Sequence, residues 1–268
     1  GPLKWDISLN LSRNWNKVIS LGNGINEMAV ENPRTRTVFV KHIVGYPFAM
    51  ITGYVQKTDG DGNKVYDSNG QPVRSDELSI LGNGNADITG GLSNSLTYKR
   101  ITLGISIDFK SGGELYSGTN VKLTLSGLTK RTLTDREGGF HIEGVRQTGL
   151  NSDNKPVYEP ITLDLNQQQI YNYWKNLGEC DQASFIYDAS FIKLRQVTLG
   201  YSLPPELLNK ISLKTIEISF VSRNLAILYN KVENVDPESS YNISNARGLD
   251  YFGLPGTRTY GCNLKIVF

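Results

Sequence analysis

Hydrophobic and polar residues alternate strictly between Arg258 and Phe268, at the end of the chain. One side of this segment is polar, and the other carries the apolar residues Tyr260, Cys262, Leu264, Ile266 and Phe268. Alternation with a period of two predicts a β-strand with one apolar and one polar face. Such a strand is typical of a transmembrane β-barrel, and equally of a half-buried sheet in a soluble sandwich. This segment alone leaves both interpretations open.

The same alternation recurs along the chain and predicts six strands in all. They begin near Leu3, Ile88, Ile101, Ser190, Thr215 and Arg258. The pattern is cleanest between Ile101 and Lys110, where apolar residues occupy every odd position. In the fourth strand the phase changes at the adjacent polar residues Arg195 and Gln196. An extra residue in one strand produces such a change, so we expect a β-bulge there.

Short and long connections alternate between these strands. Strands two and three are joined at Lys99-Arg100, and strands four and five by a turn after Leu203. The other connections are long and cover residues 14–86, 111–189 and 230–256. Extended segments are predicted within 37–55, and a short helix around 170–175. Short turns at one end and long loops at the other are typical of outer-membrane barrels, whereas a soluble sandwich has no reason to sort them.

Composition excludes several classes of protein. The 28 basic residues nearly balance the 26 acidic residues, so the net charge is +2 and a nucleic-acid footprint is not expected. Cys180 and Cys262 are too few for a disulfide framework. No run reaches the roughly 18 apolar residues of a membrane-spanning helix. The chain opens at Gly1-Pro2 without a secretory signal, and we expect it to be a piece of a longer protein.

Few residues in the sequence suggest chemistry. Asp59, Asp61 and Asn63 stand at alternate positions, like the start of a calcium loop. The sixth position holds Lys64 instead of Gly, and the twelfth holds Gly70 instead of Glu, so a solvated turn is the favoured interpretation. Zinc spacings, nucleophile elbows and phosphate-binding loops are missing. We therefore expect no enzymatic activity and no cofactor.

Aromatic residues of the long connections are the candidate binding residues. Tyr241, Tyr251 and Phe252 could stack on sugar rings or hold a peptide, or they could pack loop against loop. Tyr229, at a strand end, fits an interfacial aromatic girdle better. If the apolar sides face lipid, the opposite lumenal side carries Lys193, Arg195 and Glu217. A plain solvated wall is the favoured interpretation of these three, ahead of contacts with a plug or a solute.

Several ordered blocks resemble the SusC/RagA family of TonB-linked outer-membrane transporters from Bacteroidetes. The most characteristic block is S-F-I-K-L-R-Q-V-T-L-G-Y-S-L-P at 190–204. Further similar blocks follow the family order, at K-W-D-I-S-L-N (4–10), V-G-Y-P (44–47), T-G-Y (52–54), S-R-N-L (222–225), D-P-E (236–238) and P-G-T-R-T-Y-G (255–261). The resemblance covers nearly the whole chain.

The resemblance implies an all-β fold: a segment of an antiparallel transmembrane β-barrel with long extracellular loops. Residues 1–268 would form the last six or so strands of a barrel of about 22 strands, without its plug or N-terminal extension. Six strands cannot close a barrel, so the remaining strands and the plug would be needed as partners. The other implied partners are outer-membrane lipid, a SusD-like surface lipoprotein and, through the plug, the TonB complex, in a dimer of transporter–lipoprotein pairs.

The implied function is import of large nutrients, oligosaccharides or oligopeptides, across the outer membrane of a Gram-negative, Bacteroidetes-like bacterium. A second hypothesis is a secreted, soluble β-sandwich that binds carbohydrate. The two differ in what covers the apolar side of the strands. Lipid covers it in the first case, and a second sheet of the same protein covers it in the second.

Overall fold

Antiparallel strands dominate the computed structural model, which describes residues 2–30, 35, 37–208, 213–239 and 246–268. The elements are β1 (Leu3–Arg13), β2 (Glu27–Ala29), β3 (Val38–Ile43), β4 (Met50–Gly53), β5 (Ser79–Asn83), β6 (Ile88–Tyr98), β7 (Ile101–Ser111), β8 (Glu114–Ser117), α1 (Gly118–Leu125), the 3-10 turn η1 (Lys130–Leu133), β9 (Phe140–Leu150), β10 (Pro156–Leu165), α2 (Gln167–Cys180), the 3-10 turn η2 (Gln182–Phe185), β11 (Ile186–Asp188), β12 (Phe191–Ser202), α3 (Pro205–Leu208), β13 (Thr215–Asn230), β14 (Leu249–Asp250) and β15 (Thr259–Val267). None of the helices in these ranges is long and apolar enough to cross a membrane.

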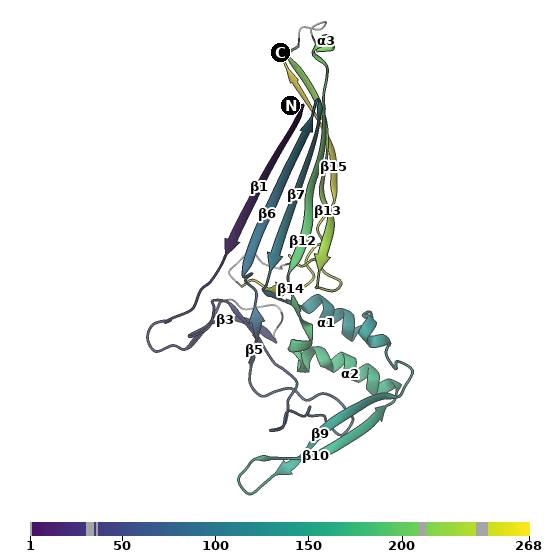
Figure 1. Cartoon of the computed structure of the whole chain (residues 1–268). Helices are drawn as coiled ribbons and strands as arrows, with labels where there is room; N and C mark the ends of the chain where they lie inside the picture. Colours follow the sequence, from purple (N-terminus) through teal and green to yellow (C-terminus); the bar gives the residue numbers. More distant parts are fainter. Residues whose placement is uncertain (1, 31–34, 36, 209–212, 240–245) are drawn as a thin grey trace.

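The six strands predicted from alternation form one long sheet in the order β1-β6-β7-β12-β13-β15, and every neighbouring pair is antiparallel. Figure 1 shows both termini and the short connections at one end of this sheet. The three long connections all lie at the other end. The prediction that short and long connections are sorted to opposite ends is therefore confirmed.

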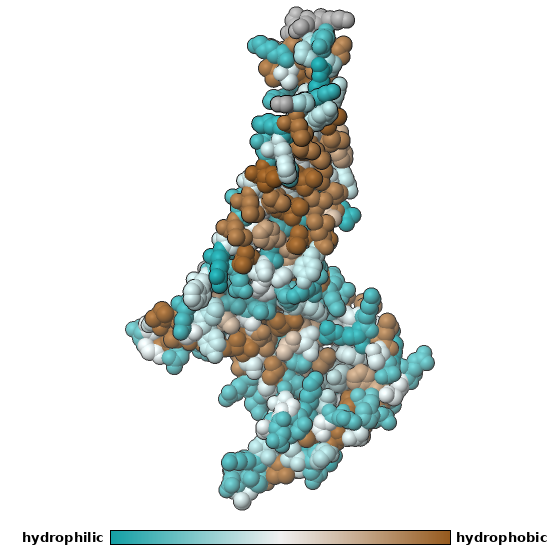
Figure 2. Space-filling view, viewed as in Figure 1, coloured by the Kyte–Doolittle hydropathy of each residue, from teal (hydrophilic) through white to brown (hydrophobic). Residues whose placement is uncertain are grey.

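The strand register gathers the apolar residues on one face of the sheet. One row across four strands consists of Leu9, Leu92, Ile107 and Leu194. The two edge strands leave this face open, with Leu9 62% and Leu264 63% exposed. Figure 2 shows the resulting hydrophobic band along the sheet. A sandwich would bury this face beneath a second sheet, and no other sheet of the described residues covers these exposed side chains, so the sandwich fold of the second hypothesis is wrong.

The phase change in β12 is a β-bulge, as predicted. Pairing with β7 passes from Leu194 opposite Ile107 directly to Gln196 opposite Ser106, so Arg195 is the extra residue. The apolar face consequently continues from Leu194 to Val197. The bulge leaves Lys193 and Arg195 together on the polar face, close to the end where the long connections begin.

The long connections fold into a cap with its own hydrophobic core. This cap contains the sheet β2-β3-β4-β5, the hairpin β9-β10, the sheet β11-β8-β14 and the helices α1 and α2. Phe185, Ile51 and Leu249 come from three different connections, and each is at most 1% exposed in this core. Most of the buried apolar residues of the chain therefore lie in the cap and not beneath the long sheet.

Helix α2 confirms the helix expected around 170–175, although it is longer, at 14 residues. Its start has a clear local cause, because Asn166 and Gln169 form a reciprocal capping box. The expected extended segments are β3 and β4.

Helix α1 was not predicted, since its β-branched and polar residues are poor helix formers. It begins where the Ser117 side chain accepts a hydrogen bond from the Asn120 amide.

Side-chain hydrogen bonds join the three connections to one another. Oε2 of Glu114 accepts a hydrogen bond from the Asn83 amide over 2.6 Å, which joins the first connection to the middle one. The Ser117 hydroxyl donates to Oδ2 of Asp250 over 2.9 Å, which joins the middle connection to the last. Strand β14 also pairs with β8 in parallel, although more than a hundred residues separate them. The last connection is thus held against the middle one, which determines where its charged residues lie.

Candidate functional site

A cluster of five charged residues joins the polar face of the sheet to the last long connection. Its members are Asp108 on β7, Lys193 and Arg195 on β12, and Asp236 and Glu238 on the segment after β13. We call this set the charged clamp. Lys193 Nζ lies 2.5 Å from Oδ1 of Asp236 and 2.6 Å from Oε2 of Glu238. Arg195 joins Asp108 to Glu238. Its Nε lies 2.7 Å from Oδ2 of Asp108, and one of its terminal nitrogens lies 2.6 Å from Oε1 of Glu238.

The charged clamp is shielded from water most completely at Lys193 and only partly at its carboxylates. The side chain of Lys193 is 7% exposed, and those of Asp236 and Glu238 are 23% and 39% exposed. Burial alone raises the pKa of Glu238, but its hydrogen bonds from Arg195 and Lys193 outweigh burial and lower that pKa below its usual value. Glu238 therefore stays ionised, and both cations keep a charged partner.

Phe191 forms the floor beneath the two cations. Its ring lies 4.9 Å from Nζ of Lys193 and 5.8 Å from the guanidinium carbon of Arg195. Both distances fall within the range of cation–π contacts. Because the cations cover this ring, Phe191 does not offer a free aromatic surface to a ligand.

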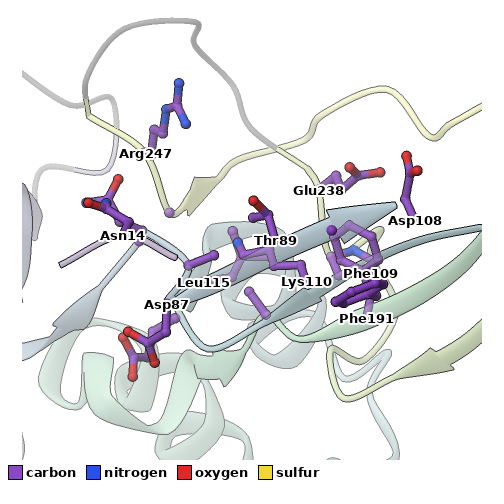
Figure 3. Close-up of a pocket in the computed structure, with 18 of the residues that line it drawn as sticks. Asn14, Asp87, Thr89, Asp108, Phe109, Lys110, Leu115, Phe191, Glu238 and Arg247 are labelled. Atoms are coloured by element: carbon purple, nitrogen blue, oxygen red, sulfur yellow. The ribbon is translucent and has the colours of Figure 1, made fainter. Parts of the chain in front are cut away.

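A pocket of about 680 Å³ opens beside the charged clamp, between the ends of β6, β7 and β12 and the last connection. Figure 3 shows the charged and aromatic side chains that line it, among them Asp87, Asp108, Lys110, Glu238 and Arg247. The volume suits a segment of a large polar ligand. The pocket belongs to the polar side of the sheet, opposite the hydrophobic band.

The predicted aromatic residues lie elsewhere in the cap. Tyr251 and Phe252 contact each other edge to face, with ring centroids 5.2 Å apart. Tyr251 also lines a second pocket of about 400 Å³ against Tyr116 and α1. Phe252 is 57% exposed, and its amide donates to the Thr119 hydroxyl over 2.8 Å. Tyr241, the third candidate, lies outside the described residues. Whether these aromatics hold a solute stays a prediction.

The acidic candidate Asp59 is engaged by its own turn. One of its oxygens accepts hydrogen bonds from the amides of Asp61 and Asn63, at 2.9 and 2.8 Å. The other accepts from the Asn63 side chain at 3.0 Å, and these bonds lower the pKa of Asp59. Among the described residues no group of three or more potential ligands is placed to hold a metal ion. The structure thus places all three residues in an exposed turn.

The residues of the charged clamp can be identified in the sequence, but the contacts between them cannot. The alternation predicts Lys193 and Arg195 on the lumenal side, and the D-P-E block is a separate motif in the sequence. The favoured interpretation of a plain solvated wall is wrong for these two cations, because they lie in a shielded ion network. Glu217 lies on the same face, opposite Ser202 and Lys265. The available signal was the opposite charge of two blocks, one on the fourth strand and the other at the start of the last long connection.

No family model matches the chain. It is 25% identical over 292 aligned residues to TonB-dependent receptor P3 of Formosa agariphila, which covers 98% of this chain and 27% of that protein. It is also 24% identical to the TonB-dependent receptor SusC of Bacteroides thetaiotaomicron, over 74% of this chain and 18% of that protein. The chain is thus similar to TonB-dependent receptors, SusC among them.

Solved structures show that the chain has the fold of part of a known transporter. The RagAB peptide importer in its open-open state matches all of the chain with a TM-score of 0.63, at 19% identity, and the match covers 27% of the RagAB chain. The closed-closed state gives a TM-score of 0.62. The expected fold, a segment of an antiparallel β-barrel with long loops at one end, is thereby confirmed. The chain spans about a quarter of the length of the relatives that it matches.

Proposed function

We propose that this chain forms part of the barrel wall and outer cap of a TonB-dependent importer in the outer membrane of a Bacteroidetes-like bacterium. The observation that carries the proposal is the hydrophobic band, which no other part of the described chain covers. An apolar face of this kind is stable against lipid tails. The charged clamp and the large pocket lie on the opposite face, which becomes the lumen.

In this proposal the chain supplies the C-terminal portion of the barrel. Strands β1 and β15 each pair with only one strand among the described residues. An unpaired strand edge in lipid costs several kcal/mol for each unsatisfied backbone group. The remaining barrel strands of the receptor pair with these edges, and its plug occupies the lumen beside the clamp.

The proposed solute is a large nutrient, an oligosaccharide or an oligopeptide. The names of the relatives support this class, since RagAB is a peptide importer and SusC is a TonB-dependent receptor. A SusD-like lipoprotein closes over the cap, TonB drives the plug, and two transporter–lipoprotein pairs associate. Tyr251, Phe252 and Tyr241 provide aromatic contacts to the solute. The process is gated passage and requires no covalent chemistry from this chain.

Uptake in cells producing the intact receptor tests the proposal. Labelled oligosaccharides and oligopeptides are offered before and after a protonophore abolishes the proton-motive force. We expect the receptor in the outer-membrane fraction, uptake of one class of solute, and loss of that uptake with the protonophore. A receptor that stays soluble without detergent, or uptake that is indifferent to the protonophore, would contradict the proposal.

A further inference from the structure

The pocket beside the charged clamp contains a lysine that has no anionic partner among the described residues. Lys110 lies near the end of β7 on the polar face, next to the strand pair that carries Asp108 and Lys193. Its side chain is half-buried, and it forms no ion pair or hydrogen bond through its ammonium among the residues that the structure describes. An ammonium that has lost part of its hydration favours a nearby negative charge.

The neighbouring carboxylates are already held by other donors. Glu238 binds both cations of the charged clamp at 2.6 Å. Oε2 of Glu114 accepts the amide of Asn83 over 2.6 Å, and Oδ2 of Asp188 lies 2.6 Å from the ammonium of Lys231. The negative charges of these three carboxylates attract the ammonium of Lys110 at longer range, but none of them lies within ion-pair distance of it. The protein surroundings therefore leave the charge of Lys110 incompletely compensated.

Two cations of the pocket, Lys110 and Arg247, and two of its carboxylates, Asp87 and Glu114, have no ion pair within the described part of the chain, so what Lys110 lacks is a contact partner. Arg247 is exposed in the lining of the pocket. Asp87 is also exposed, and in Figure 3 its carboxylate points away from Lys110. A bound anion could thus contact Lys110, with Arg247 as a second cation in the lining of the same pocket.

The aromatic residues of the pocket are poorly placed to stack on a sugar ring. Phe191 is covered by the cations of the charged clamp. Phe109 lies against Gly90 on the neighbouring strand, where a Cβ added at Gly90 would come within 2.3 Å of the ring. Recognition in this pocket therefore depends on charge and hydrogen bonding more than on stacking.

We propose that the pocket binds a carboxylate group of the imported solute, with Lys110 as its ion-pair partner and Arg247 as a second cation in the lining of the same pocket. The inference rests on the proposed import function and adds that the solute is acidic. Acidic oligopeptides and uronate-containing oligosaccharides share this chemistry, and the probes below separate them.

Binding to the intact receptor in detergent tests the inference. Four probes are used: a glutamate-rich peptide, its glutamine counterpart, an oligogalacturonide and a neutral galactose oligomer. The variants are Lys110→Met, which removes the charge, Lys110→Arg, which keeps it, and Lys265→Met as a control. Lys265 lies on the same polar face, at the far end of β15.

We expect wild-type receptor to bind one acidic probe better than its neutral counterpart, and more weakly as salt rises. Lys110→Met should weaken that binding about tenfold, corresponding to about 1.4 kcal/mol, and Lys110→Arg by no more than about threefold. Lys265→Met should leave it unchanged. The inference is overturned if Lys110→Met binds the acidic probe as tightly as the wild type does. It is also overturned if the substitution weakens the binding of acidic and neutral probes equally.

Two further results separate the inference from the import function. If the receptor binds and imports only a neutral probe, the acidic-solute inference fails and the import function stands. If Lys110→Met lowers the unfolding temperature of the ligand-free receptor while Lys110→Arg restores it, Lys110 pairs with another part of the receptor, and the inference is again overturned. If no solute is imported at all, the import function itself fails.

Discussion

The ammonium of Lys193 lies 2.5 Å from Oδ1 of Asp236, although the two residues are 43 positions apart in the chain. This pair fixes the start of the last long connection against the polar face of β12. Arg195, presented by the bulge, reinforces it through Glu238. A local irregularity in one strand thus helps to position a whole loop of the cap.

Removing the Lys193 charge should loosen this loop. Lys193→Met leaves Asp236 and Glu238 without one cation in a shielded site, and breaking such a pair costs about 3 kcal/mol. Faster hydrogen exchange in residues 231–239 of the intact receptor and a lower unfolding temperature would show it. Lys4→Met is the control, because its ion pair with Asp6 on β1 is largely exposed and should matter little. Equal effects of the two substitutions would contradict the role of the clamp.

Acid should weaken the attachment of β11 to the segment after β13. Hydrogen bonds from Lys231 and then from Ser190 lower the pKa of Asp188 to about 2, from an ordinary 3.8. A depressed carboxylate pKa stabilises the fold above the unfolded pKa, and this contribution disappears as pH falls from about 4 to about 2. The gap in unfolding temperature between wild type and Asp188→Asn should therefore be constant from pH 6 to 5 and close toward pH 2. A gap that is independent of pH would refute the assignment.

A charge on the hydrophobic band should be costly if lipid covers it. Ile105→Arg places a guanidinium on the apolar face of β7, which costs about 2–4 kcal/mol near the middle of a bilayer. Ser106→Arg puts the same side chain on the polar face of the next position and should be much milder. Urea titration of the intact receptor folded into vesicles compares the two. Similar losses for both variants would exclude lipid as the covering phase.

A side chain at position 90 should disturb the sheet. A Cβ on Gly90 would lie 2.3 Å from Cζ of Phe109 and 2.8 Å from the Asn10 carbonyl oxygen, and the backbone oxygen cannot move aside easily. We expect Gly90→Ala to lower stability by about 1–3 kcal/mol. Gly261→Ala, on the edge strand β15 with nothing within 4 Å, should be nearly neutral. The free energy of unfolding is measured for both variants. A larger loss for Gly261→Ala than for Gly90→Ala would disprove the close approach of Phe109 and Asn10 to Gly90.

Motif blocks acquire a physical meaning once the chain is folded. Asn224 of the S-R-N-L block adopts a left-handed conformation at φ 52°, which asparagine tolerates better than most residues. Its side chain donates to the Thr257 carbonyl over 3.2 Å and so connects β13 to the segment before β15. The block could be recognised from the sequence, but its partner could not.

Local pattern alone determined the six long strands, their two faces, the bulge at Arg195, the sorting of the connections and helix α2. These features follow from side chains a few residues apart, since alternation, turns and capping act over short distances. Tertiary structure alone decided that the loops form a cap with a core, that Lys193 meets Asp236, and that Lys110 has no ion-pair partner among the described residues. Each depends on residues brought together from distant parts of the chain, and charge or hydrophobicity along a loop does not encode which distant residue it will face.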